Sequence, residues 1–275
     1  MARDPRRSDV MTVGTIAVEA GVIRRPMLAE VVANRPLTPH LRRITLTGAE
    51  LDRFGYDGPD QLARIFLAPA PGVELHLPGS PQWWPALQAM PAEQRPVVRN
   101  YTVRRLDAGR RELDIDFVLH GDGGPASAWA RRAAPGDRIG VLSDGAAYAP
   151  PADTDWQLLV GDETAMPAIT AAVEALPPDA RAIALIEVGS AEHEIGVRTP
   201  AGVTLTWLHR GGTPAGGSDV VIRTLRDLAF PAGTPYAFVA GESAMVTTVR
   251  RHLCTERGIA KERVYFGGYW KLAPH

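Results

Sequence analysis

The sequence predicts two domains, a six-stranded antiparallel β-barrel followed by an α/β domain with a parallel sheet. Its 275 residues, 45% of them hydrophobic, are enough for two cores of ordinary size. Strand-like runs bounded by turn residues recur in the first half, whereas apolar strands alternate with helical patterns in the second. A proline-containing segment at 149–153 separates the two patterns and marks the predicted boundary.

The first domain, residues 24–150, contains six runs that are β-branched or alternate in polarity. These runs are 27–32, 41–46, 62–67, 97–104, 113–119 and 138–142. Six such strands can close a small barrel, and the tight turn at 135–137 favours a meander or Greek-key order. The segment 69–96, with Trp83 and Trp84, is expected to form a loop and a short helix that pack on the barrel.

Residues 1–23 are expected to form a flexible N-terminal tail. The stretch 10–18 superficially resembles a signal peptide, but it is only weakly apolar and Glu19 ends it. No run approaches the roughly 18 uninterrupted apolar residues of a membrane span. A cytoplasmic protein that makes no membrane contact is therefore expected.

Strands and helices alternate in the second domain, residues 151–275. The predicted strands are 157–160, 182–186, 203–207 and 236–240, and the predicted helices are 166–176, 220–228 and 244–257, followed by a C-terminal extension. Such alternation predicts a parallel sheet, which binds ligands at the carboxyl ends of its strands. The segments 161–164, 187–190, 209–212 and 241–243 all fall at that edge.

A first patch suited to a flavin dinucleotide lies in the strand 97–104. Arg99 and Tyr101 share one face of that strand, and Thr102 takes the other. An aromatic ring can lie against an isoalloxazine, a guanidinium can pair with pyrophosphate oxygens, and a hydroxyl could reach a ring or ribitol oxygen. An ordinary surface strand with cross-strand pairs is the alternative.

The second patch follows the strand 113–119 and has the features of a phosphate cradle. Gly121, Gly123 and Gly124 break the strand before Pro125 opens a short helical run. Glycines allow close approach of a phosphate, and the amino end of a helix favours an anion. The glycine spacing also fits a Rossmann fingerprint, but the helical run is too short for a crossover. An ordinary hairpin loop remains the alternative.

With four further motifs, these patches resemble the siderophore-interacting protein family, which is related to the ferredoxin-NADP reductase superfamily. The resemblance runs from about Arg25 to Trp270 in the family's order. Its motifs are RxYT at 99–102, DFVxHG at 116–121, GPASxW at 124–129, GDETAMPAI at 161–169, WLHR at 207–210, AGE at 240–242 and GYW at 268–270. Two positions depart from the family's pattern. Lys271 stands where an arginine often follows the terminal tryptophan, and Arg64 stands where lysine is common, which puts the siderophore preference in question.

The resemblance implies an FAD-dependent ferric-siderophore reductase. Hydride would pass from NADPH or NADH on the α/β domain to the flavin in the barrel, and single electrons would then pass to Fe(III) held by its own chelator. No side chain is expected to be catalytic, because the flavin carries the chemistry. The implied cofactor-binding residues are Arg99, Tyr101, Thr102, Val103, Asp116, Val118, His120, Gly124, Pro125, Ala126, Ser127, Trp129, Asp162, Thr164, Glu242 and Trp270.

The resemblance also implies a ferric siderophore as substrate, with Arg64 and Lys271 in its basic pocket. Solvated surface charges are the alternative for these two residues. Thr164 could instead cap a helix, Glu242 could be an exposed glutamate at a helix start, and Trp270 could serve terminal packing. Reduced ferredoxin as the electron donor is left open.

The composition of the chain excludes several classes of function and of site. The formal net charge of −1 excludes a bulk basic field for nucleic acid, and no basic run indicates a membrane patch. One cysteine, Cys254, excludes an internal disulfide and any Cys-based iron–sulfur or zinc site, and the histidines show no metal-ligand spacing, so no metal site is predicted. A monomer is expected. A general flavin reductase or electron-transfer protein and a non-catalytic siderophore-binding protein are the alternative functions.

Overall fold

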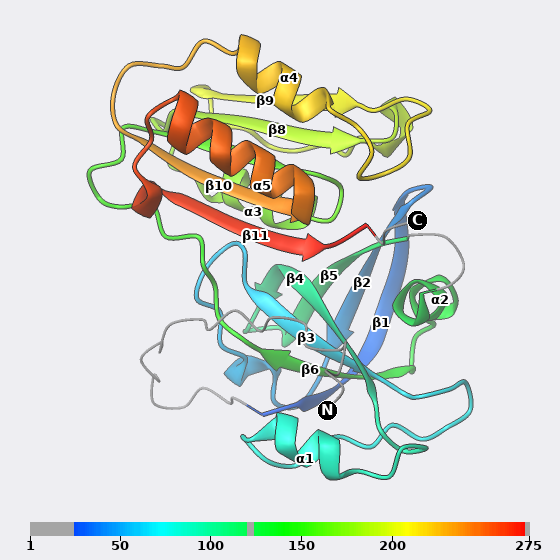
Figure 1. Ribbon diagram of the computed structural model, residues 1–275. Helices are drawn as coiled ribbons and strands as arrows, with labels where there is room; N and C mark the ends of the chain where they lie inside the picture. Colours follow the sequence, from blue (N-terminus) through cyan, green and yellow to red (C-terminus); the bar gives the residue numbers. More distant parts are fainter. Residues whose placement is uncertain (1–24, 120–123, 273–275) are drawn as a thin grey trace, which may run out of the picture.

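The computed structural model describes residues 25–119 and 124–272 (Figure 1). A closed antiparallel barrel is followed by a five-stranded parallel sheet with helices on both faces, which confirms the predicted fold class.

The barrel consists of β1 (Met27–Thr38), β2 (Leu41–Thr47), β3 (Leu62–Leu67), β4 (Val97–Asp107), β5 (Glu112–Val118) and β6 (Arg138–Ser143). The strands close in the order β1-β2-β5-β4-β3-β6, so all six predicted strands are present. Strand β1 runs beyond its predicted end because its pairing with β2 continues to Thr38 and Leu41. Ala63, Ile65 and Leu67, alternate residues of β3, fill the interior.

Two helices accompany the barrel. The expected short helix is α1 (Trp83–Ala89), which packs on the outside through an edge-to-face contact of Trp83 with Phe66, at 5.6 Å between ring centroids. Helix α2 (Pro125–Arg132) contributes Trp129 to the barrel core. The start of α2, with Pro125 and Ala126, therefore lies at the barrel wall.

The parallel sheet contains β7 (Trp156–Gly161), β8 (Ala182–Val188), β9 (Val203–His209), β10 (Pro235–Glu242) and β11 (Val264–Trp270), in the order β11-β10-β7-β8-β9. Strand β11 is not among the predicted strands and lies in the segment expected as a C-terminal extension. Gly267 and Gly268 weaken the strand pattern in the sequence. The pairing of β11 with β10 stabilises the strand in spite of these glycines.

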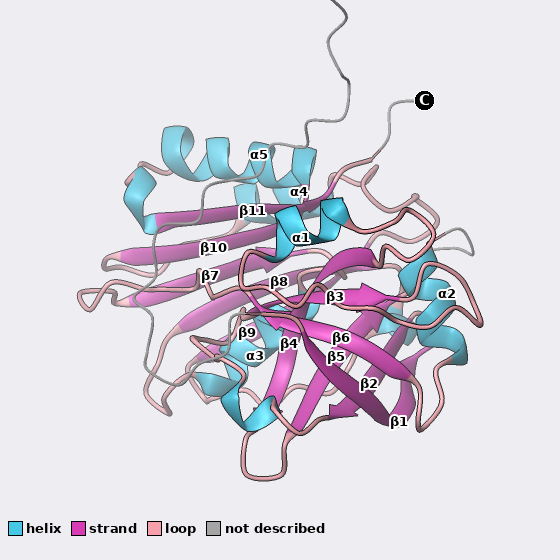
Figure 2. Cartoon of the chain, turned by 90° about the horizontal axis from the view of Figure 1, so that it is seen from below, coloured by secondary structure: helices cyan, strands magenta, loops and turns pink. Residues whose placement is uncertain are grey.

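Helix α3 (Met166–Ala175) lies on the sheet face toward the barrel, and α4 (Val220–Asp227) and α5 (Ser243–Arg251) cover the opposite face (Figure 2). Residues on every side of α3 are buried, because the sheet and the barrel enclose the helix. Helix α5 ends earlier than the predicted 257, since the chain widens into a π-helical turn at His252–Glu256.

The two domains share a core and polar contacts. Leu41 and Val118 of the barrel belong to the same apolar cluster as Ile169 of α3. Asp60, which lies before β3 in the barrel, accepts hydrogen bonds from the backbone N–H groups of Ala147 and Tyr148 next to the linker, at 3.0 and 2.9 Å, and its burial raises the pKa of Asp60. These contacts hold the linker against the barrel.

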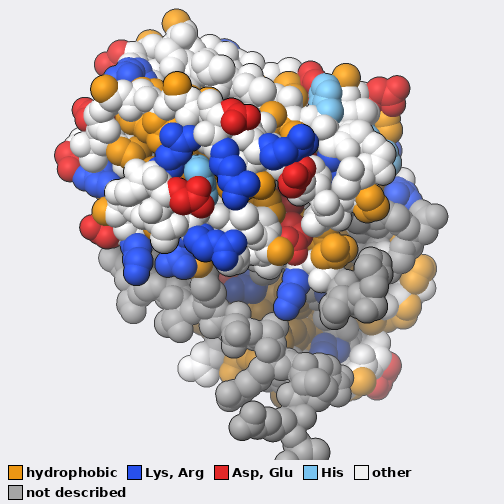
Figure 3. Space-filling view, turned by 45° about the horizontal axis from the view of Figure 1, so that its top comes forward, with side chains coloured by type: hydrophobic (Ala, Val, Ile, Leu, Met, Phe, Trp, Pro, Cys, Tyr) orange, Lys and Arg blue, Asp and Glu red, His pale blue; other side chains and the backbone are white. Residues whose placement is uncertain are grey.

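Basic and acidic side chains are interspersed over the face seen in Figure 3, in keeping with the formal net charge of −1. Within 25–119 and 124–272, no helix combines the length and the apolar character that crossing a membrane requires.

Candidate functional site

The predicted flavin strand, β4, meets the end of the parallel sheet. Thr102 is buried, and its side chain lies near that of Tyr269 on β11. Arg99 is exposed and donates to the backbone oxygen of Val98 at 2.8 Å. Val103 faces the barrel interior with no exposed surface, so its side chain packs in the core and does not face a cofactor site.

Tyr101 belongs to an aromatic series at the barrel wall. Its ring centroid lies 4.4 Å from that of Phe117, which in turn lies 5.6 Å from Trp129 of α2. Burial raises the pKa of Tyr101 to about 12, so its hydroxyl stays protonated at neutral pH. One part of the ring therefore packs on the barrel, and the half-buried remainder faces outward.

Strand β5 places Asp116 and Val118 in structural contacts. The Asp116 carboxylate accepts two hydrogen bonds from Arg43 on β2, at 2.7 and 2.8 Å, and this pairing raises the pKa of Arg43. Arg43 and Asp116 are register partners, so the pair ties β2 to β5. Val118 packs toward α3.

The amino end of α2 fits an anion. Its first residue is Pro125, Gly124 precedes it in an extended conformation, and no side chain of the described residues caps it. A Cβ at Gly124 would make only ordinary contacts, the nearest at 3.7 Å from Ser127 Oγ, so the fold itself tolerates a side chain there. The unpaired N–H groups and dipole of a helix start suit a phosphate. The predicted His120, like Gly121 and Gly123, lies outside the described residues.

Four predicted site residues from the sheet, Asp162, Thr164, Glu242 and Trp270, lie together at its carboxyl edge. Asp162 Oδ1 accepts from the backbone N–H of Thr164 at 2.9 Å and from its hydroxyl at 2.5 Å. Asp162 Oδ2 accepts from the backbone N–H of Glu242 and from the indole N–H of Trp270, both at 2.8 Å.

Glu242 is a helix cap, the structural alternative considered for it, although it is buried rather than exposed. Its Oε2 accepts from the backbone N–H groups of Ala244 and Met245, at 2.5 and 3.0 Å, at the start of α5. The helix-cap alternative for Thr164 is wrong, because α3 begins after Ala165 without a side-chain cap and the Thr164 hydroxyl bonds Asp162 instead.

The two predicted substrate residues lie on different domains. Arg64 on β3 donates to Asn100 Oδ1 at 3.1 Å, pairs with Asp144, and lies 5.1 Å over the ring of Trp83. Lys271 follows β11 directly and is exposed.

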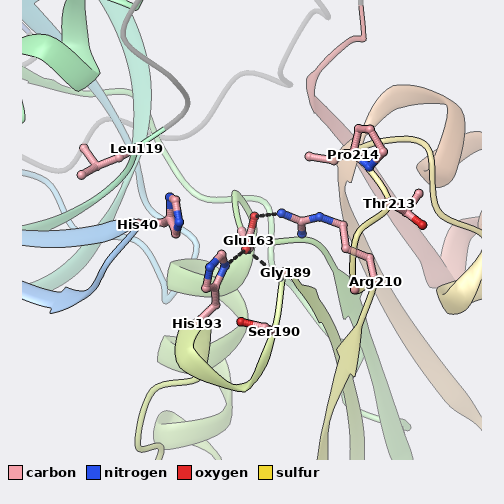
Figure 4. A pocket seen from close by; sticks show the side chains of 11 residues that line it. His40, Leu119, Glu163, Gly189, Ser190, His193, Arg210, Thr213 and Pro214 are labelled. Carbon is pink, nitrogen blue, oxygen red and sulfur yellow. Dashed lines mark hydrogen bonds and ion pairs between the residues drawn. The ribbon is translucent and has the colours of Figure 1, made fainter.

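An open pocket of about 330 Å³ lies between the barrel and the carboxyl ends of β7, β8 and β9 (Figure 4). Glu163 is at its centre. One carboxylate oxygen contacts His193 Nδ1 at 2.6 Å and the backbone N–H of Gly189 at 3.0 Å, and the other accepts from Arg210 at 3.0 Å. The barrel contributes His40, whose ring lies 4.4 Å from that of His193.

The charges of this pocket compensate one another. Burial alone would raise the pKa of Glu163, but hydrogen bonds from His193 and Arg210 and the charge of Arg210 hold it below the ordinary value. Burial raises the pKa of Glu187, which lies 4.0 Å from Arg210. Arg210 thus pairs with a charged Glu163 beside a second carboxyl group.

Four residues of this pocket were not predicted from the sequence as site residues: Glu163, His193, Arg210 and His40. Glu163 and Arg210 follow predicted strands, and that position was the available signal. Nothing local marks His40, which a barrel hairpin brings to the sheet edge. Among the residues that the structure describes, no group of three or more His, Cys, Asp or Glu side chains could hold a metal ion.

Two family models match the chain. The siderophore-interacting FAD-binding domain matches residues 30–148, and the siderophore-interacting protein model matches residues 154–273.

Curated relatives match over most of their length. An uncharacterized protein of Mycobacterium tuberculosis is 39% identical over 90% of this chain and 91% of its own. The ferric vibriobactin reductase of Vibrio cholerae is 34% identical over 90% of this chain and 89% of its own. An NADPH-dependent ferric-chelate reductase of Escherichia coli is 31% identical over 83% of this chain and 86% of its own.

Solved structures show the same fold. A siderophore utilization protein from T. fusca has a TM-score of 0.81 and 35% identity, covering 91% of this chain and 94% of its own. A ferredoxin NADP+ reductase from Neisseria gonorrhoeae, solved with FAD and NADP, has a TM-score of 0.62 at 14% identity and covers 90% and 99% of the two chains.

Proposed function

The chain belongs to the siderophore-interacting protein family, and on this premise we propose that it is an FAD-dependent reductase of ferric siderophores with a nicotinamide donor. The observation that carries the proposal is the pocket that His40 and Leu119 of the barrel line together with Glu163 and Arg210. It joins the end of β5 to the carboxyl edge of the parallel sheet, where such sheets bind nucleotides.

FAD, when bound, supplies a group that accepts a hydride and releases electrons singly. In our proposal the amino end of α2, with Gly124, holds the pyrophosphate together with the exposed guanidinium of Arg99. The outward part of the Tyr101 ring contacts the isoalloxazine, and the Thr102 hydroxyl bonds its edge. Asp116 supports this wall through Arg43.

The pocket around Glu163 receives the nicotinamide dinucleotide in this proposal. It lies at the ends of β7, β8 and β9, and its polar lining includes Ser190, Arg210 and Thr213. The donor is NADH or NADPH. The relative from E. coli is named for NADPH, which makes both donors part of the test.

The substrate proposal is a ferric siderophore that keeps its iron, so that the protein supplies no iron ligand. Arg64 and Lys271 form a basic rim for anionic chelates. Replacing both by glutamine is expected to raise the KM for ferric catecholates several-fold, with a salt dependence in the parent that fades in the variant. Flavin reduction by the donor should be unchanged in stopped flow. An unchanged KM, or slower hydride transfer, would place the substrate elsewhere.

The decisive experiment follows the visible spectrum of the purified protein without oxygen. We expect a yellow flavin spectrum that NADH or NADPH bleaches and a ferric siderophore restores, with Fe(II) trapped by a ferrous chelator. A colourless protein that binds the ferric siderophore without turnover would support the binding-protein alternative. Equal reoxidation by the siderophore and by unrelated one-electron acceptors would support a general flavin reductase.

A further inference from the structure

We propose that Asp162 is a positioning residue: its carboxylate holds the indole of Trp270 as a fixed wall at the nicotinamide edge of the site. The inference rests on the proposed function for the identity of the ligand, but the attachment of Trp270 can be tested without it.

The Asp162 carboxylate has no capacity left for a ligand. Two carboxylate oxygens offer about four acceptor positions, and four donors of the protein occupy them. Oδ1 serves the N–H and hydroxyl of Thr164, and Oδ2 serves the N–H of Glu242 and the indole of Trp270. Asp162 is also only 8% exposed. Its effect on a cofactor must therefore pass through the groups that it holds.

The backbone around Asp162 is built to admit this carboxylate. Gly241, at the end of β10, has a φ of +138°, which side-chain-bearing residues rarely adopt. A Cβ at that position would lie 2.7 Å from Asp162 Cγ. A glycine is thus required for the carboxylate to reach both the start of α5 and the end of β11.

Further contacts fix the position of Trp270. The Ser243 hydroxyl donates to the Trp270 backbone oxygen at 2.8 Å, and the Leu272 N–H donates to Glu242 Oε1 at 3.2 Å. On the other side, Gly216 has a φ of +78°, and a Cβ there would lie 3.0 Å from the indole. The loop after β9 therefore closes directly over the ring.

These contacts define what Trp270 does. The residue follows Tyr269, whose side chain lies near Thr102 on the flavin strand, and it lies where β7, β10 and β11 end. A ring fixed there limits where a planar nicotinamide can lie. Releasing it should weaken productive binding of the donor more than the hydride step at saturation.

The first test measures whether Asp162 holds the C-terminus, using apoprotein. Asp162→Asn presents an amide where two donors need an acceptor. We expect carboxypeptidase to trim the chain past Leu272 about tenfold faster than in the parent, as followed by mass spectrometry. The matched control is Asp219→Asn, because Asp219 is an exposed acid of the same domain that pairs with Arg223. It should be trimmed at the parental rate.

The second test measures the donor. Asp162→Asn is expected to raise the KM for NADH or NADPH several-fold while the saturating rate of flavin reduction changes less than twofold. Trp270→Phe, which keeps a ring but removes the N–H, should raise the KM similarly. The double variant should be no worse than either single variant, because both remove the same hydrogen bond.

Parental trimming with a parental KM in Asp162→Asn would overturn the proposal, as would full additivity in the double variant. If Asp162→Asn fails to fold, Trp270→Phe decides alone: a parental KM and trimming rate would refute the role of the indole bond. If no nicotinamide reduces the flavin of the parent, the proposed function fails, and the trimming result still stands or falls by itself.

Discussion

Tyr101 is expected to contact both the barrel and the flavin with its ring. Its ring packs on Phe117 and, in our proposal, on the flavin. Tyr101→Ala is expected to weaken FAD binding by roughly 1–2 kcal/mol, in line with the energies of aromatic pairs. Titration of apoprotein with FAD measures the affinity, and circular dichroism checks that the fold survives. Tyr101→Phe is the control, since it keeps the ring. Unchanged affinity in Tyr101→Ala would remove this residue from the site.

The lowered pKa of Glu163 predicts that the stability of the folded protein depends on pH. Its pKa in the folded protein lies below the unfolded value of about 4.5, because His193 and Arg210 favour the charged form. Its stabilising contribution is therefore complete above that unfolded value and is lost as the pH falls through the lower folded pKa. Glu163→Gln should cost about 1–3 kcal/mol at pH 7 and should lose less further stability on acidification than the parent does.

Thermal unfolding between neutral pH and about pH 3 measures this effect. Glu192→Gln is a suitable control, because Glu192 is exposed in the neighbouring turn. If Glu163→Gln loses as much stability at low pH as the parent does, the ion pairs of Glu163 do not contribute to the pH dependence of stability.

At the scale of the elements, the amino end of α2 is a place where a substitution is expected to affect ligand binding without affecting the fold. Gly124 is extended and has room for a side chain, so its replacement should leave the helix intact. Arg99→Ala combined with Gly124→Val is expected to reduce FAD affinity more than the affinity for FMN, which lacks the pyrophosphate bridge. Titration with both flavins tests this. An equal loss for both flavins would indicate misfolding or a different pose.

At the scale of the whole molecule, an ion pair between described residues connects the domains. Arg104 on β4 contacts Glu174 on α3 at 2.6 Å, and the side chains are only 11% and 26% exposed. Glu174→Gln should destabilise the protein by about 1–3 kcal/mol, because a largely buried guanidinium loses its nearer carboxylate and keeps only the more distant Asp116, at 3.9 Å. We expect calorimetry to show a lower Tm and a broader transition as the domains begin to unfold separately.

The control for this prediction is Glu262→Gln, an exposed position of the same domain. A Tm shift no larger than in that control would mean that the shared apolar core alone couples the domains.

The sequence by itself determined the fold class, the six barrel strands and the alternation of the second domain. Those features depend on side-chain periodicity and turn residues that act over a few positions, as in the run 62–67, which is strand β3. The same local signals failed for β11, where two glycines obscure a strand that its neighbour β10 stabilises. The order of motifs also determined the family.

Only the tertiary structure decided which polar groups meet. Asp162 and Trp270 lie far apart in the chain, as do Glu163 and Arg210, and they are in contact because the strands stand in the order β11-β10-β7-β8-β9. Strand order and register result from packing across the whole sheet, which no local pattern records. For the same reason, the sequence predicted that the site lies at the carboxyl edge of the sheet. Only the fold determined that Asp162 bonds Trp270 and that Glu163 bonds Arg210.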